Sequence, residues 1–254
     1  MVEVPPTLEG WYALHDFRAL DWARWKQVSA EERSAIVAEA AEHLRAAEAH
    51  EDAEEGSSAL YRIVGHKADF MFLHLRPTPD QLNDLETAFA RTRLSDFTTR
   101  TYSYVSITEL GLYEAMARGG SQDPEALRHL PFVQARLKPI VPDRRYMTFY
   151  PMNKRRGEVY NWYLLSLDER RAMMRGHGTV GHAYAAVVQQ MITGSVGLDD
   201  WEWGVTLFSE DPLQFKKLVY EMRFDEVSAK FAEFGTFLLG VRARPDELAS
   251  LLAV

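Results

Sequence analysis

The chain contains no cysteine among its 254 residues. Disulfide bonds, iron–sulfur ligation by thiolates and thiol catalysis are therefore excluded, and the composition fits a reducing compartment. No run of about 18 apolar residues occurs, and the first ten residues lack a basic segment followed by an apolar one. From these absences we expect a cytoplasmic protein without a membrane segment.

The chain also has fewer basic than acidic residues. Lys and Arg together number 29 against 37 Asp and Glu, which gives a formal net charge of −8. Nonspecific binding to nucleic acid or to an anionic membrane favours a basic surface, so neither kind of partner is expected. Hydrophobic residues make up 46% of the chain and charged residues 26%, which is typical of a globular protein with a substantial core.

Several motifs of common enzyme classes are missing as well. The chain has no GxGxxG after a strand, no GxxxxGK[ST] phosphate loop, no GxSxG nucleophile elbow and no HExxH. Nucleotide cofactors, serine-hydrolase chemistry and hydrolytic zinc sites therefore lack support. The paired acids Asp199–Asp200 and Asp225–Glu226 are predicted to be solvated or structural. Trp162, Trp201 and Trp203 are predicted to be core or interface residues.

Short aromatic or β-branched runs alternate with helical patterns along the chain. Such runs predict strands at residues 10–17, 59–64, 70–75, 101–107, 146–154, 203–208 and 234–241. Helix starts are predicted from capping residues: Ser29 with Glu32 for a helix to Glu48, Thr78 with Pro79, and Ser166 with Glu169.

One internal similarity indicates the architecture. Phe70–Leu85 and Trp203–Leu218 each contain an apolar strand, a polar turn and a proline, with Gln two residues and Leu six residues after the proline. Two β-α-β-β-α-β units predict an α+β fold of two ferredoxin-like halves, whose antiparallel sheets form a dimeric α+β barrel. Chance similarity between two ordinary strand–turn–helix units is the alternative. The predicted organisation is a first half at 1–110, a connecting segment at 111–143, and a second half at 144–254 that carries the functional site.

Two histidines, His177 and His182, lie five residues apart on a predicted helix. At 3.6 residues per turn this spacing separates them by roughly 140°, so they cannot both bind one metal ion from a regular helix. If a metal binds, a single histidine holding the iron of a macrocycle fits the pattern better, since heme iron often needs only one proximal histidine. The alternative for either residue is an ordinary polar or packing role.

The predicted strand at 146–154 places Tyr150, Met152 and Lys154 on one face. A phenol, a thioether and an ammonium in a row suit a pocket where a redox-capable aromatic ring lies beside an anionic ligand. A half-buried strand that ends in a solvated charge run is the alternative. Further cations precede this strand and could gather around one carboxylated ligand: Arg136, Lys138, Arg144 and Arg145.

Five long motifs resemble those of the coproheme decarboxylases, the hydrogen-peroxide-dependent heme synthases of the chlorite dismutase-like superfamily. They are YPMNKRR, NWY, RGHGTVGHAY, VQQMITGSVGLDDWEWGVTLF and EMRFDEVSAKFAEFGTFLLG. The resemblance covers nearly the whole chain and is densest between Tyr146 and Gly240. It implies two ferredoxin-like halves per subunit and a ring-shaped homopentamer. It also implies oxidative removal of carboxylates from two propionates of iron–coproporphyrin III (coproheme), which leaves the vinyl groups of heme b.

Carried over residue by residue, the resemblance implies the roles of the site residues. His177 would be the proximal iron ligand, and Tyr150 would become the radical oxidant, with Lys154 beside it in catalysis. The remaining contacts to the substrate would come from Arg136, Lys154, Arg223 and Ser228 on propionates, Met152 beside the reacting group, and Gln190 over the distal face.

Two positions separate this chain from relatives of the same superfamily. His182 stands where bacterial members of the subtype often carry arginine, so it is expected to be a plain polar residue. Gln190 stands where chlorite dismutases place a distal arginine, which argues against chlorite decomposition.

The function expected is therefore coproheme decarboxylation, with hydrogen peroxide as oxidant and a transient exchange with coproporphyrin ferrochelatase. Coproheme would be substrate and redox centre at once, and heme b the product. The alternatives are a chlorite dismutase or heme peroxidase, and a heme-binding carrier or sensor without chemistry.

Overall fold

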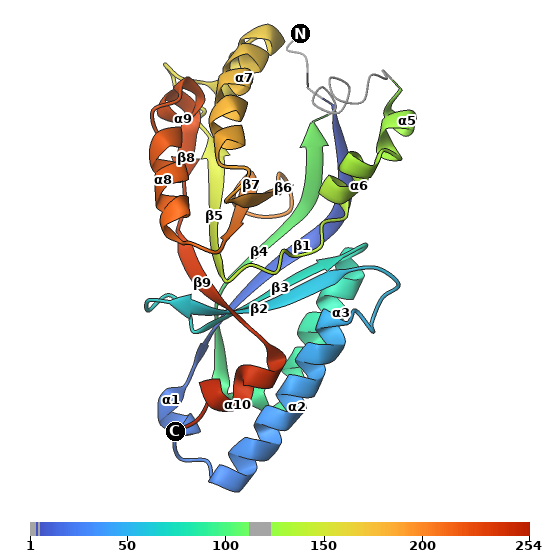
Figure 1. Ribbon diagram of the computed structural model, residues 1–254, viewed down its shortest axis with the longest axis vertical. Helices are drawn as coiled ribbons and strands as arrows, with labels where there is room; N and C mark the ends of the chain where they lie inside the picture. The colour runs from blue at the N-terminus through green and yellow to red at the C-terminus, as the bar shows by residue number, and fades with distance from the viewer. Residues whose placement is uncertain (1–3, 5, 112–122) are drawn as a thin grey trace. The chain divides into compact units, whose positions relative to one another are not determined.

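The computed structural model describes residues 4, 6–111 and 123–254, so residues 112–122 of the predicted connecting segment lie outside the described part of the chain. The chain divides into two compact units (Figure 1). Unit 1 comprises Met1–Gly10, Ile107–Leu137 and Pro142–Phe237, and unit 2 comprises Trp11–Ser106, Lys138–Val141 and Leu238–Val254.

Unit 2 has the ferredoxin-like order of elements. Its elements are β1 (Thr7–Leu20), α1 (Trp22–Trp25), α2 (Ala30–Glu48), β2 (Ser57–Val64), β3 (Phe70–Arg76), α3 (Pro79–Ala90), η1 (Arg93–Phe97) and β4 (Thr98–Gly111). The first residues of β1, to Gly10, and the last residues of β4, from Ile107, belong to unit 1. The strands lie in the order β4-β1-β3-β2, and β3 pairs antiparallel with both β1 and β2. The C-terminal segment adds β9 (Leu238–Ala243) beside β2, then η3 (Pro245–Glu247) and α10 (Leu248–Leu251).

The helices of unit 2 begin at the predicted capping residues. The Ser29 hydroxyl accepts the Glu32 N–H at 3.2 Å before α2, and Thr78 and Gln81 form a reciprocal capping box before α3. Apolar side chains of these helices pack on the sheet around Phe72, whose ring centroid lies 4.8 Å from that of Phe89. Local capping and the apolar helix faces thus explain the positions of α2 and α3.

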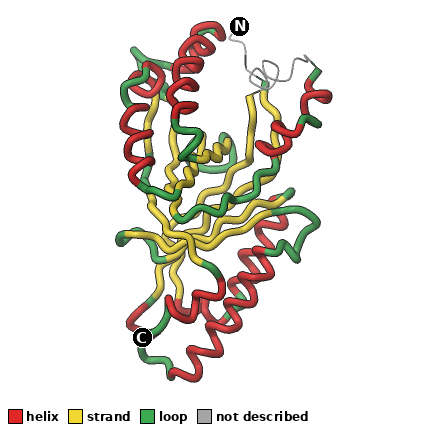
Figure 2. Tube along the Cα trace, in the orientation of Figure 1, coloured by secondary structure: helices red, strands yellow, loops and turns green. Residues whose placement is uncertain are grey.

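Unit 1 repeats the same order. It contains α5 (Pro124–Arg128), α6 (Pro131–Leu137), β5 (Tyr146–Lys154), η2 (Trp162–Leu164), α7 (Leu167–Ala183), β6 (Gln189–Gly194), β7 (Trp203–Ser209), α8 (Leu213–Met222), α9 (Glu226–Phe231) and β8 (Ala232–Phe234). Antiparallel pairings give the order β8-β5-β7-β6-β4. Figure 2 draws the strands of the chain in yellow and its helices in red. The prediction of an antiparallel α+β fold with two ferredoxin-like halves is confirmed, and the similar segments Phe70–Leu85 and Trp203–Leu218 are β3-α3 and β7-α8.

Two details differ from the sequence-based expectation. The strand predicted at 234–241 is interrupted: β8 ends at Phe234 and β9 begins at Leu238. Between them, Gly235 donates its N–H to the Pro151 carbonyl at 2.8 Å, and a side chain there would collide with Pro151 and Trp201. The pattern also fails to predict β6, whose sequence QQMITG follows the long helix after a short turn and has no strong aromatic alternation.

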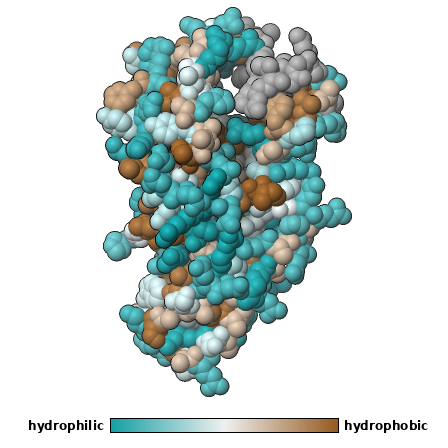
Figure 3. Space-filling model, viewed as in Figure 1, coloured by the Kyte–Doolittle hydropathy of each residue, from teal (hydrophilic) through white to brown (hydrophobic). Residues whose placement is uncertain are grey.

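No helix in the described part of the chain combines the length and apolar character needed to cross a membrane. On the face drawn in Figure 3, hydrophilic residues predominate and apolar residues gather in small patches.

A buried polar network lies on the sheet of unit 2. Arg76 is fully buried and donates to the Asp52 carboxylate at 2.7 Å and to the Ser58 hydroxyl at 3.2 Å. The same hydroxyl lies 2.8 Å from Nδ1 of the buried His74. Burial, with the positive charges of Arg76 and His43, lowers the pKa of His74 to about 3. His74 therefore stays neutral in the folded protein at pH values between about 3 and 6.5, where a histidine of the unfolded chain becomes protonated.

We expect the free energy of unfolding to fall as the pH drops from 6.5 towards 3, because His74 binds a proton in the unfolded chain but not in the folded protein. His74→Gln should remove up to about 1.4 kcal/mol per pH unit of this dependence. Urea unfolding at pH 7, 6 and 5 measures the slope. Replacing the exposed His66 by Gln is the matched control, and an unchanged slope in His74→Gln would contradict the assignment.

Candidate functional site

The predicted strand residues share one face of the sheet of unit 1. In β5, side chains alternate so that Tyr150, Met152 and Lys154 point the same way. Tyr150 stands opposite Val205 on β7, and Leu207, two residues farther along β7, stands opposite Gln190 on β6. Since paired residues of an antiparallel ladder point to the same face, Gln190 joins the three β5 side chains there.

Tyr150 is held in an aromatic cage. Its ring stacks on Phe237 with centroids 4.4 Å apart and lies 5.7 Å from Phe234. Burial raises the pKa of the Tyr150 hydroxyl above its usual range, although the positive charge of Arg223 acts in the opposite direction. Tyr150 is therefore a neutral phenol that retains its proton, held in place by ring contacts.

Arg223 lies beside this cage. It is the C-cap residue of α8, and its guanidinium carbon lies 4.0 Å from the centroid of the Phe234 ring. The residue is exposed, so its N–H groups remain available to a ligand while the planar group stacks on the aromatic ring.

Lys154 places a cation on the same dry face. Burial lowers the pKa of its ammonium to about 8, while the carboxylates of Asp225 and Glu202 act to raise it. Its Nζ lies 4.9 Å from the centroid of the Trp162 ring, and its backbone N–H donates to Glu202 at 2.8 Å. Lys154 thus remains mainly charged at neutral pH and can attract an anionic group.

His177 is tied to a carboxylate that also caps a helix. Its Nδ1 lies 3.0 Å from Asp225 Oδ2, which also accepts the Ser228 hydroxyl at 2.7 Å. Asp225 Oδ1 accepts the N–H groups of Val227 and Ser228 at the start of α9. Burial acts to raise the pKa of Asp225, but hydrogen bonds from Ser228 and His177 outweigh it and the pKa is lowered. With Nδ1 engaged, Nε2 of His177 is the nitrogen left to bind a metal.

Asp225 is the site residue that pattern analysis does not identify. The expectation of a solvated or structural acid is incomplete, because one carboxylate both caps α9 and contacts His177. The sequence contains one usable indication, an Asp three residues before Ser228 at a helix start. The contact to His177 joins residues 48 positions apart and requires the fold.

The remaining predicted residues occupy distinct positions. Arg136 lies in the last turn of α6, and its Nη1 lies 3.5 Å from the Gln190 carbonyl oxygen. A Cβ on Gly181 would lie 3.7 Å from Gln190 Nε2, so α7, which carries His177, passes close to the Gln190 amide. His182 is exposed in the last turn of α7 and does not join the His177–Asp225 cluster.

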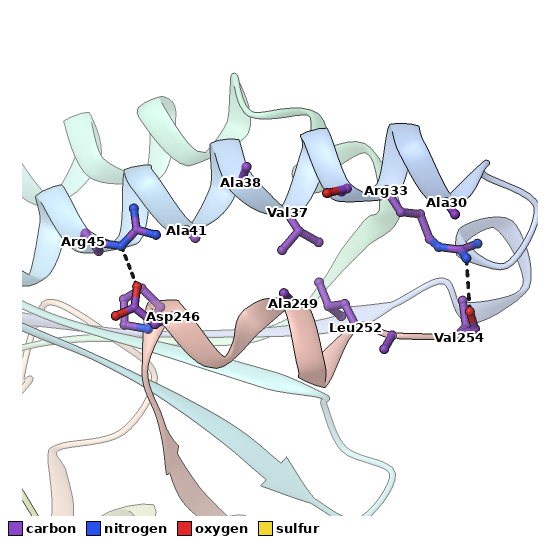
Figure 4. A pocket seen from close by; sticks show the side chains of 13 residues that line it. Ala30, Arg33, Val37, Ala38, Ala41, Arg45, Asp246, Ala249, Leu252 and Val254 are labelled. Carbon is purple, nitrogen blue, oxygen red and sulfur yellow. Dashed lines mark hydrogen bonds and ion pairs between the residues drawn. The ribbon is translucent and has the colours of Figure 1, made fainter.

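A different part of the chain contains an open cavity of about 430 Å³, in unit 2 (Figure 4). It lies between α2 and the C-terminal segment. At its ends, Arg45 donates a hydrogen bond to the Asp246 carboxylate and Arg33 donates one to the Val254 carbonyl. None of the predicted site residues lines it.

Within the described residues, no group of three or more His, Asp or Glu side chains could hold a bare metal ion. A macrocycle that supplies the other ligands would need only one protein ligand, and Nε2 of His177 is available for that bond.

Comparison with known proteins places the chain in a family. The chlorite dismutase family model matches residues 33–243. A protein of Haloquadratum walsbyi, named as a presumptive heme-binding protein, is 50% identical over 99% of this chain, and one of Natronomonas pharaonis with a similar name is 49% identical over 98%. The chain belongs to the chlorite dismutase family. It spans about half the length of these two curated relatives, 48% and 42% respectively.

Solved structures show the same fold. A protein of Thermus thermophilus, described as a novel heme-binding protein, matches with a TM-score of 0.91 and 46% identity over 100% of this chain and 99% of that one. A mutant chlorite dismutase of Candidatus Nitrospira defluvii matches with a TM-score of 0.77 and 22% identity over 97% of each chain.

Asp225→Ala should lower the free energy of unfolding by about 2 kcal/mol, because α9 loses its cap and the Ser228 hydroxyl loses its buried acceptor. Asp225→Asn should lose less, since asparagine also caps helices. Guanidinium unfolding measures both, with Glu226→Ala on the exposed pair with Lys230 as control. Equal stability of the Asp225→Ala and Glu226→Ala variants would show that the Asp225 contacts contribute nothing.

Proposed function

We propose that the chain binds coproheme through His177 and oxidatively decarboxylates two of its propionates with hydrogen peroxide, giving heme b. The observation that carries the proposal is the neutral phenol of Tyr150, buried on the same sheet face as Lys154 and beside Arg223. The family match and the names of the heme-binding relatives support it. A homopentamer and transient exchange with coproporphyrin ferrochelatase belong to the same proposal.

The donor set of unit 1 fits an iron porphyrin with carboxylate side chains. His177 offers Nε2 while Asp225 fixes its other nitrogen, which would orient the imidazole towards iron. Arg136, Lys154 and Arg223 are cations suited to propionates, although Arg136 also contacts the Gln190 carbonyl. Ser228 would reach a propionate only if its hydroxyl shared its proton with Asp225 or left that carboxylate.

Coproheme, as substrate, supplies the iron that reacts with peroxide. The residues of the chain then position and carry out the hydrogen transfer. Tyr150 gives one electron and its hydroxyl proton to the peroxide-derived oxidant, and the resulting phenoxyl oxygen takes a hydrogen atom from the β-carbon of a propionate held by Lys154. The resulting carbon radical gives its second electron to the remaining oxidising equivalent of the same peroxide and loses carbon dioxide, which leaves a vinyl group. The aromatic cage holds the phenol still, which matters because misplacement by about 1 Å can cost roughly 100-fold in rate.

The alternatives account for fewer of these features. Chlorite decomposition is disfavoured because Gln190 places a neutral amide where the resemblance leads us to expect arginine in chlorite dismutases. A heme carrier or sensor would use His177 but gives no reason for a buried phenol on the same sheet face as a desolvated ammonium.

Tyr150→Phe is the decisive variant. Phenylalanine keeps the ring contacts with Phe234 and Phe237 but lacks the O–H that gives up an electron and a proton. We expect coproheme binding to persist and heme b formation to fail when peroxide is added, as followed by chromatography of the porphyrins.

Binding must be measured separately from conversion in this test. Absorbance titration with coproheme should give similar affinity for the wild type and Tyr150→Phe, whereas His177→Ala should lose the ferric spectrum of the bound iron. Wild-type yields of heme b from Tyr150→Phe would refute the tyrosine mechanism.

Coproheme affinity should also depend on the charge of Lys154. Because the Lys154 pKa is about 8 in the free protein, its charge is present below that pH and is lost as the pH rises through it. We expect affinity to weaken by about tenfold between pH 7 and pH 9.5 in the wild type. Lys154→Arg, which stays charged, should show a flat profile over the same titration. Parallel profiles for the two proteins would exclude Lys154 as a propionate partner.

A further inference from the structure

Three neighbouring strands of unit 1 bring together a tryptophan, a glycine and a carboxyl group. Trp203 on β7 stands opposite Met152 on β5 and opposite Gly194 on β6, and Gly194 stands opposite Ile107 on β4. Paired residues share a face, and Glu109 is two residues beyond Ile107. Trp203 and Glu109 therefore lie on the sheet face that carries Tyr150 and Lys154, and Trp203 is adjacent to Met152.

The indole and the carboxyl group are in direct contact. Trp203 donates its Nε1–H to Glu109 Oε1 at 2.9 Å. The other carboxyl oxygen lies against Gly194, where any side chain would collide with it. The glycine thus makes the space in which Glu109 reaches across β6 to Trp203.

Glu109 is also a stronger base than an ordinary glutamate. Burial raises its pKa, the hydrogen bond from Trp203 acts to lower it, and the negative charge of Glu9 raises it further, with a net increase. A carboxylate of raised pKa accepts the indole proton more readily once the ring has lost an electron.

A second tryptophan near the predicted site has the opposite environment. The ammonium of Lys154 lies 4.9 Å from the centroid of the Trp162 ring. A cation at this distance makes loss of an electron from the ring harder, whereas the carboxylate beside Trp203 makes it easier. The two rings therefore differ in the ease of oxidation although both lie next to residues of the predicted pocket.

We propose that Trp203 is a second one-electron donor of the site and that Glu109 accepts its proton. In this step Trp203 gives one electron to a peroxide-derived oxidant, its Nε1–H bond breaks, and the proton passes to Glu109 Oε1. The products are a neutral indolyl radical, a neutral carboxylic acid and an oxidant reduced by one electron. The identity of the natural oxidant, which comes from hydrogen peroxide and coproheme, depends on the proposed function. In the proposed role, Trp203 reduces the peroxide-derived oxidant when no propionate is bound next to Tyr150.

The first experiment avoids the porphyrin. Photogenerated tris(bipyridine)ruthenium(III), with persulfate as electron acceptor, oxidises the purified protein, and peptide mass spectrometry quantifies oxidised Trp203 and Trp162. Glu109→Gln is the critical variant, because the amide oxygen can still accept the indole N–H while the amide cannot take the proton. Electron paramagnetic resonance then tests the wild type for a radical that Trp203→Phe removes.

We expect oxidised Trp203 to exceed oxidised Trp162 in the wild type, and Glu109→Gln to lower the Trp203 product by about tenfold without changing that of Trp162. Trp162→Phe is the matched control and should keep the radical. A merely structural hydrogen bond predicts equal Trp203 oxidation in the wild type and Glu109→Gln, and that result would overturn the proposal. Oxidation concentrated on Trp162 or Trp201 would overturn it too.

A second experiment uses Tyr150→Phe loaded with coproheme and treated with hydrogen peroxide. With Tyr150 removed, oxidation at Trp203 should increase several-fold over the wild type and should fall by about tenfold in Tyr150→Phe/Glu109→Gln. If the ruthenium experiment succeeds while this one gives no Trp203 product, the redox pair stands and its coupling to coproheme is refuted. If the ruthenium experiment fails, the pair is refuted whatever the fate of the decarboxylase proposal.

Discussion

The register of β5 against β7 is the constraint on which the site depends. Tyr150 opposite Val205 and Met152 opposite Trp203 fix the phenol, the thioether and the ammonium on one face. A slip of one residue would turn all three to the other face, because side chains alternate with a period of two. Met147 and Phe149 on the opposite face are fully buried, so a slip of the register would expose apolar surface at a large hydrophobic cost.

Charged and polar groups of the site lie close together in a region with little access to solvent. Asp225 serves two elements at once, because its carboxylate caps α9 and accepts hydrogen bonds from Ser228 and His177. Its negative charge also helps Lys154 keep a proton that burial would otherwise remove. The helix start, the imidazole and the ammonium are therefore coupled through one side chain, which explains why a capping residue belongs to the site.

Aromatic rings around this charged cluster have unlike electrostatic surroundings. Tyr150 lies in an apolar cage with a guanidinium nearby, Trp162 faces an ammonium, and Trp203 faces a carboxyl group. Oxidation of a ring depends on where its proton and its positive charge can go. The cage keeps the Tyr150 phenol protonated and fixed in place, whereas the carboxyl group beside Trp203 provides a proton acceptor within the protein.

The sequence by itself determined the class of fold and the local elements. The capping residues Ser29, Thr78 and Ser166 begin helices as predicted, since capping depends on neighbours three residues away. Alternation in 146–154 determined which β5 side chains share a face. Only the tertiary structure decided that Asp225 contacts His177, that Glu109 contacts Trp203, and that the break between β8 and β9 places Phe234 and Phe237 against Tyr150. Those contacts join residues distant in the chain, so local pattern contains no information about them, and burial then sets the pKa of Tyr150 and Lys154.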